Sequence, residues 1–200
     1  MDDHMASNAF SIWKSDRRAR MDELYSAHAT VGGVGPGRRT TTEQLNWALV
    51  LRLAAEFQGF VRDLHDEATD VVVARTGNPS AAYPTMLRHL LSLNRKLDRG
   101  NANPSTLQED FLRFGFKILD EVKASYVKGE HWLVAMNRVN EARNGIAHSD
   151  SSKIALATGA SSVDLKQVKS WDGSMRALAG ALDSVVSKNI AALTAGGKPW

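Results

Sequence analysis

The 200-residue sequence predicts an all-α protein, an up-and-down bundle of about five to six helices. Apolar residues recur at steps of three and four along almost the whole chain, which is the spacing of one helix face. No stretch of useful length alternates apolar and polar residues, as a half-buried strand does. Breaks rich in glycine, proline or asparagine separate the periodic stretches and mark where the helices end.

The first half of the chain contains three predicted helices. The first spans about residues 8–30, before a segment at 31–37 that is too rich in glycine to stay regular. The second begins at the threonines 40–42, where the sequence Thr-Thr-Glu-Gln has the spacing of a capping box, and ends at Gly77-Asn78-Pro79. The apolar stripe of this helix consists of Leu45, Leu49, Leu53, Phe57, Phe60, Leu64, Ala68 and Val71. A third helix is expected over about residues 83–97.

The second half contains three more. A fourth helix is expected to begin at a Ser105 cap and to carry apolar residues as far as Tyr126. The fifth spans about residues 130–147, and the sixth carries its apolar residues over about 168–193. Between them we expect a polar stretch with a short extended piece at 153–156. The buried row of the fifth helix is predicted to be Trp132, Met136 and Val139.

The periodic stretches divide the chain into residues 1–42, an N-terminal helix with its glycine-rich linker, and residues 43–200, the main helical domain. His4-Met5-Ala6-Ser7 has the character of a remnant of cloning. The first residues carry neither a basic stretch nor an apolar one, so they do not read as a secretory signal. With no long apolar window and no cysteine, we expect a cytoplasmic protein that makes no contact with a membrane.

Composition excludes several classes of chemistry. The absence of cysteine removes disulfides, thiolate zinc sites, iron–sulfur clusters and cysteine nucleophiles. The histidines lack the Glu-x-x-His and His-x3-His spacings of helical metal sites, so we expect no metal and no cofactor. The glycine-rich segment at 32–37 has Arg38 where a phosphate loop has its lysine, and no Gly-x-Ser-x-Gly elbow is present. The net charge of +3 permits binding to a polyanion without requiring it.

One hexapeptide, Arg143-Asn144-Gly145-Ile146-Ala147-His148, carries residues suited to phosphate chemistry. An arginine can clamp a phosphate through two hydrogen bonds, and a histidine that titrates near neutrality can move the proton of a nearby hydroxyl. RNA supplies its own nucleophile, the 2′-hydroxyl, so a metal-free ribonuclease needs little more than these two groups. From the spacing alone the opposite reading is the stronger one, because basic residues and Asn-Gly also favour a helix end.

Residues five apart on a continuous helix point about 140° apart, so Arg143 and His148 would diverge. Two arrangements could bring them together. Gly145 could loosen the last turn and let the histidine swing toward the arginine, or a second copy of the chain could supply the missing group across a two-fold axis.

The segment Asn140 to His148, placed after an apolar helix and before a polar loop and a last long helix, resembles the signature of the HEPN superfamily. Arg143, Asn144 and His148 match its motif of arginine, polar residue and histidine. The segments 56–65 and 193–200 are similar to the RiboL-PSP-HEPN branch, and the resemblance covers about residues 43–200. It implies an all-α, dimeric fold and, in many members, metal-independent ribonuclease activity.

By this resemblance, His148 acts as general base or acid at the 2′-hydroxyl, Arg143 holds the scissile phosphate, and Asn144 orients the phosphate or the imidazole. The resemblance also nominates three supporting residues on the second helix, Glu56, Arg62 and Asp63. On a helix with this apolar stripe, all three could instead simply face solvent. Trp132 and Trp171 are interpreted as core residues or dimer contacts, and His65, His89 and His131 as having no catalytic part.

The resemblance therefore implies a homodimeric endoribonuclease that cleaves RNA, leaves a cyclic phosphate and acts in defence, stress or toxin–antitoxin biology with an antitoxin or another regulatory protein as partner. The alternative is a non-catalytic helical module that binds RNA, a nucleotide or a protein, in which the same motif only ends a helix. An enzyme needs Arg143 and His148 in one open cleft, whereas a binding module does not. A third interpretation, transfer of a nucleotidyl group to Tyr83 or Tyr126 by a partner, finds no support in the sequence.

Overall fold

The computed structural model describes residues 6–32, 40–77 and 80–200, and for Thr40 and Thr41 the backbone alone. Within these ranges every regular element is helical: nine α-helices, one π-helical segment and two 3₁₀ turns, with no strand. The all-α expectation is confirmed. None of the described helices is both long and apolar enough to cross a membrane.

The N-terminal helix follows the prediction closely. α1 (Asn8–Ile12), the π-helical segment Trp13–Arg17 and α2 (Arg18–Gly32) follow one another without a break. Ser7 caps α1, since its hydroxyl accepts a hydrogen bond of 2.9 Å from the backbone N–H of Phe10. Val31 and Gly32, the first two residues of the predicted glycine-rich linker, belong to α2, and the rest of that linker lies outside the described residues. Of the supposed cloning remnant at 4–7, the structure describes Ala6 and Ser7.

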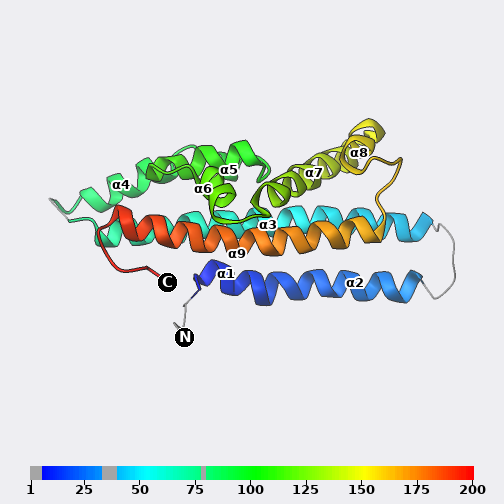
Figure 1. Cartoon of the computed structure of the whole chain (residues 1–200), viewed down its shortest axis with the longest axis horizontal. Helices are drawn as coiled ribbons and strands as arrows, with labels where there is room; N and C mark the ends of the chain where they lie inside the picture. Colours follow the sequence, from blue (N-terminus) through cyan, green and yellow to red (C-terminus); the bar gives the residue numbers. More distant parts are fainter. Residues whose placement is uncertain (1–5, 33–39, 78–79) are drawn as a thin grey trace.

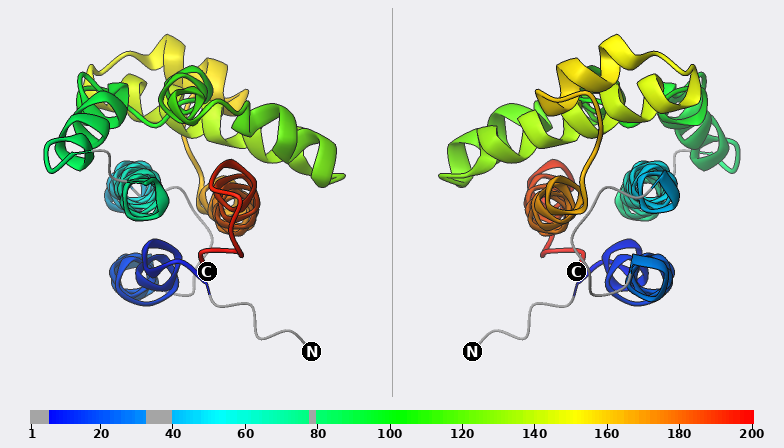
Figure 2. Two further views of the ribbon diagram at one scale, coloured as in Figure 1. Left: turned by 90° about the vertical axis from the view of Figure 1, so that its left-hand side faces the viewer. Right: turned by 90° about the vertical axis from the view of Figure 1, so that its right-hand side faces the viewer.

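α3 (Thr40–Arg75) runs the length of the molecule beside α9 (Leu165–Leu193). The N-terminal helix lies on one side of this pair and the shorter helices α4 to α8 lie on the other (Figures 1 and 2). The predicted stripe of α3 forms much of the core, with Leu49, Leu53, Phe57, Phe60, Leu64 and Ala68 all buried. The predicted capping box involves Thr41, whose side chain lies outside the described part of the chain.

The predicted third and fourth helices are wrong in extent. α4 (Tyr83–Ser92) ends before Leu97, because Leu93 is extended and Asn94 has φ 54°, and a 3₁₀ turn at Lys96–Asp98 follows. The predicted fourth helix is two helices, α5 (Pro104–Phe111) and α6 (Ile118–Ser125), with a 3₁₀ turn at Leu112–Phe114 after α5. Gly115 separates them, because it has φ 87°, a left-handed conformation that interrupts a helix.

The N-cap residue predicted for α5 is also wrong. Asn103, not Ser105, is the N-cap residue, and its side-chain oxygen accepts a hydrogen bond of 3.0 Å from the N–H of Thr106. Pro104 then occupies the first helical position, which proline favours because its missing N–H would have no partner there.

The predicted extended piece at 153–156 is wrong as well. These residues belong to α8 (Ser151–Thr158), which follows α7 (Gly129–Ala147). Asp150 caps α8 by accepting hydrogen bonds from the hydroxyl of Ser152 and from the backbone N–H groups of Ser152 and Lys153, and these bonds lower the pKa of Asp150. Ile154 and Ala157 are buried, so the short helix is held by both its cap and its packing. The missed helix, the divided fourth helix and the π-helical segment that separates α1 from α2 explain why more α-helices are described than the five to six expected.

A buried polar cluster joins α3 to the segment between α4 and α5. The guanidinium of Arg95 can only donate, so its contact of 3.2 Å makes Nδ1 of His65 an acceptor. Nε2 therefore carries the proton and donates to the backbone oxygen of Asp110 at 3.2 Å. Burial, with the charge of Arg95 in addition, lowers the pKa of His65 to about 4.

This pKa makes His65 a source of acid sensitivity. Because the unfolded chain binds the proton more tightly, the contribution of neutral His65 to stability is complete above about pH 6.5 and is lost as the pH falls toward 4. We expect the free energy of unfolding to drop between pH 7 and about pH 4.5 by roughly 2 kcal/mol more in the wild type than in a His65→Gln variant. Urea unfolding at the two pH values measures this difference, and equal drops would show that His65 does not titrate in this way.

Candidate functional site

Arg143, Asn144 and His148 lie at the carboxyl end of α7, and the structure brings the first two together. Nη1 of Arg143 donates a hydrogen bond of 3.1 Å to Oδ1 of Asn144. The same oxygen accepts a second bond, of 2.8 Å, from Nδ2 of Asn101 in the segment before α5. Asn144 is thus held in one orientation between the arginine and a neighbouring loop.

His148 stands outside this network. It is the C-cap residue of α7, where its backbone N–H donates to the carbonyl of Asn144 at 3.1 Å. Its side chain is exposed, and within the described part of the chain the imidazole has no hydrogen bond or ion pair. The ring is therefore available to a ligand but is not joined to Arg143.

The turn after α7 ends the helix in a defined way. Ser149 has φ 53°, its N–H donates to the carbonyl of Ile146 at 3.3 Å, and the N–H of Asp150 donates to the carbonyl of Gly145 at 2.8 Å. These two bonds are those of a Schellman motif. The helix continues through Gly145 to Ala147, so the expectation that Gly145 loosens the last turn is wrong.

Gly145 instead allows α8 to pack closely against α7. A Cβ atom at this position would lie 2.8 Å from Cγ1 of Ile154 and 3.0 Å from both the backbone oxygen of Asp150 and the backbone nitrogen of Ile154. A side chain cannot fit at these distances unless α8 shifts. Gly145 thereby fixes α8, and the turn that carries His148, against α7.

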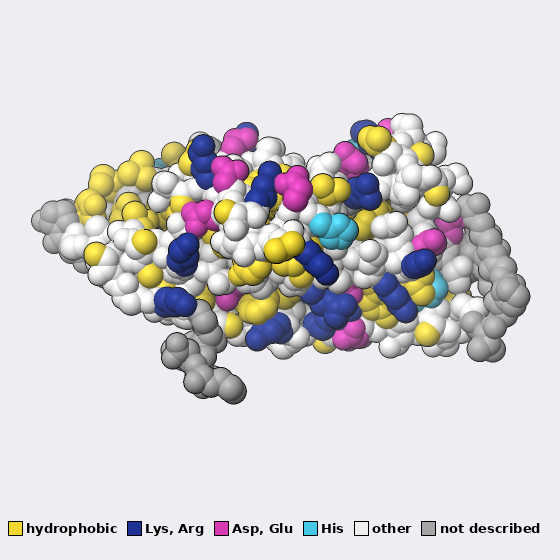
Figure 3. All heavy atoms as spheres, in the orientation of Figure 1, with side chains coloured by type: hydrophobic (Ala, Val, Ile, Leu, Met, Phe, Trp, Pro, Cys, Tyr) yellow, Lys and Arg dark blue, Asp and Glu magenta, His cyan; other side chains and the backbone are white. Residues whose placement is uncertain are grey.

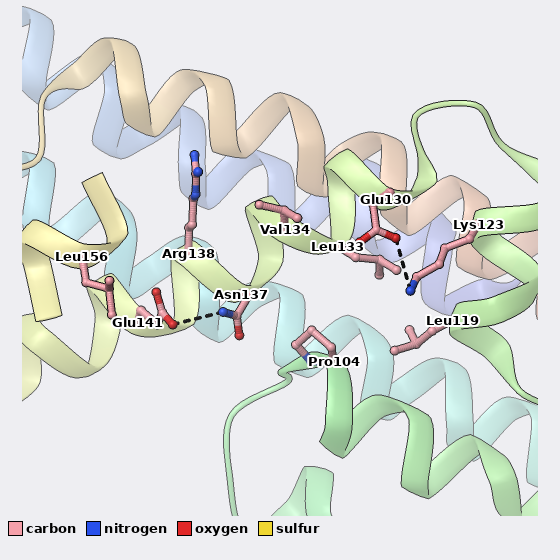
Figure 4. Close-up of a pocket in the computed structure, with 10 residues that line it drawn as sticks. All are labelled: Pro104, Leu119, Lys123, Glu130, Leu133, Val134, Asn137, Arg138, Glu141 and Leu156. Carbon is pink, nitrogen blue, oxygen red and sulfur yellow. Dashed lines mark hydrogen bonds and ion pairs between the residues drawn. The ribbon is translucent and has the colours of Figure 1, made fainter. Parts of the chain in front are cut away.

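A groove follows α7 toward this site, and we call it the α7 groove; Figure 4 shows its first part. Its first part is a cavity of about 340 Å³ whose walls, from α5, α6, α7 and α8, combine apolar side chains with polar and charged ones. Its second part is a cavity of about 400 Å³ between α7 and the start of α5. Pro104, Asn137 and Glu141 line both parts, so the two cavities are adjacent.

The second part is lined by five asparagines, and we call it the asparagine cavity. Its lining residues are Asn101, Asn103, Pro104, Ser105, Asn137, Asn140, Glu141 and Asn144. Asn144 therefore connects the predicted motif to a cavity. Sequence analysis predicted Asn144 but missed the other four, although three of the five recur at steps of three and four along α7, at 137, 140 and 144.

The predicted supporting carboxylates are engaged elsewhere. Glu56 is buried in α3 and pairs with Arg17 at 2.8 Å and with Arg20 at 3.0 Å, while Asp63 pairs with Arg17 at 2.6 Å. Arg17 lies over Gly59 of α3, where any Cβ would overlap its guanidinium. These pairs tie the N-terminal helix to α3, and neither carboxylate is bonded to Arg143, Asn144 or His148 among the described residues.

The remaining predicted residues do not line the α7 groove. Arg62 is exposed on α3 and lines neither part of the α7 groove. Trp171 is buried in α9, and Trp132 is half-buried with its ring 5.6 Å from that of Tyr126. His65 is buried in the polar cluster described above, while His89 and His131 are exposed.

In the part of the chain that the structure describes, no group of three or more histidine, aspartate or glutamate residues could hold a metal ion. Comparison of the chain with protein-family models, curated proteins and solved structures finds no match in any of the three. The case for a function accordingly rests on the residues and their geometry.

The close approach at Gly145 gives a test of how α8 is held. We expect Gly145→Ala to destabilise the protein by about 1–3 kcal/mol, because overpacking against Ile154 outweighs the better helix propensity of alanine. Gly173→Ala in α9 is the matched control, since a Cβ there meets no atom within 4 Å, and it should stabilise by about 0.5–1 kcal/mol. Thermal unfolding of both variants measures this, and a stabilised Gly145→Ala protein would contradict the packing argument.

Proposed function

We propose that this protein is a metal-independent endoribonuclease whose reaction takes place at the carboxyl end of α7. One observation carries the proposal: Arg143 is bonded to Asn144 at the edge of an open polar cavity, and the exposed imidazole of His148 lies at the end of the same helix. The resemblance to the HEPN motif, which these three residues match, supports the same conclusion.

The proposed reaction uses the 2′-hydroxyl of RNA as nucleophile. A histidine takes the hydroxyl proton as the 2′-oxygen bonds to phosphorus and the bond to the 5′-oxygen breaks. The products are a 2′,3′-cyclic phosphate and a 5′-hydroxyl, whose oxygen receives a proton as it leaves. Arg143 binds the phosphate and stabilises the negative charge that builds up on its oxygens.

A second copy of the chain would complete the site. Because α7 is regular from Gly129 to Ala147, Arg143 and the following His148 point in different directions on one helix. We therefore propose a homodimer in which the arginine of one copy and the histidine of the other act on the same phosphate. The proposed setting is defence, stress or toxin–antitoxin biology, with an antitoxin or another regulatory protein as partner.

The distribution of charge supports an anionic partner. Figure 3 shows lysine and arginine side chains spread over α9 and the N-terminal helix on one face of the molecule. The exposed basic residues of α9 include Lys166, Lys169, Arg176 and Lys188. Lysines and arginines that neutralise phosphates release counterions, so binding to RNA should weaken as salt is added.

A non-catalytic module that binds RNA or a nucleotide is the second candidate. The observation that favours it is the position of His148 outside the hydrogen-bond network of Arg143 and Asn144. Such a protein would use Arg143 and the asparagine cavity to bind and would leave the phosphodiester intact.

Cleavage of RNA in EDTA separates the two candidates. We expect the wild type to cut single-stranded RNA in EDTA at low salt, and Arg143→Ala and His148→Ala to cut it about a hundredfold to ten-thousandfold more slowly. A substrate with 2′-deoxyribose throughout should remain intact, and the RNA products should end in cyclic phosphate.

The matched control for the cleavage assay is the double variant Arg88→Ala/His89→Ala. Both residues are exposed on α4, and Arg88 makes only a surface ion pair with Asp70, so this variant should stay folded and cut like the wild type. If the wild type binds RNA without cutting it, the protein is the binding module. If all variants cut equally, the activity belongs to a contaminant.

A further inference from the structure

The asparagine cavity presents hydrogen-bonding groups whose direction is already fixed by the fold. Two of its asparagines lie one turn apart on α7. Oδ1 of Asn144 accepts bonds from Asn101 and Arg143, which leaves its amide nitrogen as the free group. Nδ2 of Asn140 donates to the carbonyls of Ala102 and Met136, both at 2.8 Å, which leaves its oxygen as the free group. The helix therefore offers one donor and one acceptor.

The segment before α5 offers the same pair. Oδ1 of Asn103 accepts from the N–H of Thr106 at 3.0 Å and from the hydroxyl of Ser105 at 2.9 Å, so its amide nitrogen is free to donate. Nδ2 of Asn101 donates to Asn144, so its oxygen remains available to accept. None of these four amides can reverse its donor and acceptor atoms without losing bonds that the structure already has.

Charge distinguishes this cavity from a phosphate site. No lysine or arginine is among its lining residues, and its one carboxylate, Glu141, accepts a bond of 3.1 Å from Nδ2 of Asn137. A phosphate would meet no cation inside it and one carboxylate at its wall. The cationic group, Arg143, lies next to the cavity and reaches it only through Asn144. The ligand that fits is therefore neutral, polar and able both to donate and to accept.

We propose that the asparagine cavity binds a nucleobase of single-stranded RNA by the hydrogen-bonding edge of the base, next to the phosphate that Arg143 holds. The Watson–Crick edge of every base combines donors and acceptors, and side-chain amides are well suited to read such an edge. The volume of about 400 Å³ is within the usual range for small-ligand pockets. This inference rests on the proposed function for its substrate class and adds the part of the RNA that is recognised.

Asn144 links the proposed base site to the residue that binds the phosphate, because it lines the cavity and also accepts a hydrogen bond from Arg143. A base that accepts a hydrogen bond from Nδ2 of Asn144 restrains this side-chain amide. The oxygen of the same amide accepts the hydrogen bond from Nη1 of Arg143. Arg143 is then oriented by the bound base as well as by the helix. RNA duplex does not offer an unpaired edge to such a cavity, so the preferred substrate is an unpaired nucleotide.

Asn103→Ser is the variant that tests this inference. Serine is also a good N-cap, so the variant keeps α5 capped and stays neutral while it removes the free amide nitrogen. Asn137→Phe, at an exposed position of α7, fills the cavity with a ring instead. Asn8→Ser, at an exposed position in the first turn of α1, is the matched control.

The measurements are titrations of the four ribonucleosides by NMR and of ten-residue RNA homopolymers in a His148→Ala background. We expect Asn103→Ser to weaken the binding of the preferred nucleoside about threefold to tenfold, and Asn137→Phe to remove it, with Asn8→Ser like the wild type. If both cavity variants bind every nucleoside and homopolymer as the wild type does, the inference is overturned.

The same measurements keep the inference separate from the proposed function. If the wild type binds nucleosides but cuts no RNA, and both cavity variants weaken this binding, the result supports the base site and overturns the ribonuclease. If the wild type cuts RNA, and both cavity variants cut RNA and bind nucleosides as the wild type does, the result supports the ribonuclease and overturns the base site. Homopolymers that bind while free nucleosides do not bind at all would show a site for the RNA backbone, and that result also overturns the inference.

Discussion

The architecture depends on one constraint, the length of α3. A helix of 36 residues can bury its surface only if other elements cover it along its whole length, and here the N-terminal helix, α9 and the short helices α4, α5 and α7 all pack on it. Covering a helix from several sides also buries polar residues that a one-sided amphipathic helix would expose. Glu56 and His65 are two such residues, and each is matched by arginine from the element that covers it.

The partners of these buried groups explain why the short helices are arranged as they are. Arg95 can reach His65 only because α4 ends at Ser92 and the chain turns back through Lys96–Asp98. Asp110 at the end of α5 accepts the backbone N–H groups of Lys96 and Leu97, so the same turn is held from the other side. The start of α5 is thereby placed beside α7, where Asn101 and Asn103 form one wall of the asparagine cavity.

Sequence analysis succeeded where periodicity decides the structure and failed where a single residue does. The long stripes of α3, α7 and α9 predict those helices well, because burial of a continuous apolar face outweighs local preferences. Gly115 ends one helix although the apolar spacing continues beyond it. Asp150 caps α8, a helix too short to show a clear apolar periodicity in the sequence. The asparagine cavity was missed for another reason: it joins residues 101 and 103 to residues on α7 through a tertiary contact that no spacing in the sequence encodes.

The motif residues therefore have separate structural roles, and this bears on how a site could work here. The Schellman turn and the contact of Gly145 with Ile154 hold His148 at the end of α7, while Asn144, four residues earlier, faces the groove. Arg143 points about 100° away from Asn144 and about 140° away from His148 on this helix, and among the described residues its hydrogen bond is to Asn144. Under the proposed function, a helix that is regular to its end keeps the arginine and the histidine of one chain apart. In the proposed homodimer, the arginine of one chain and the histidine of the other would act on the same phosphate across a two-fold axis.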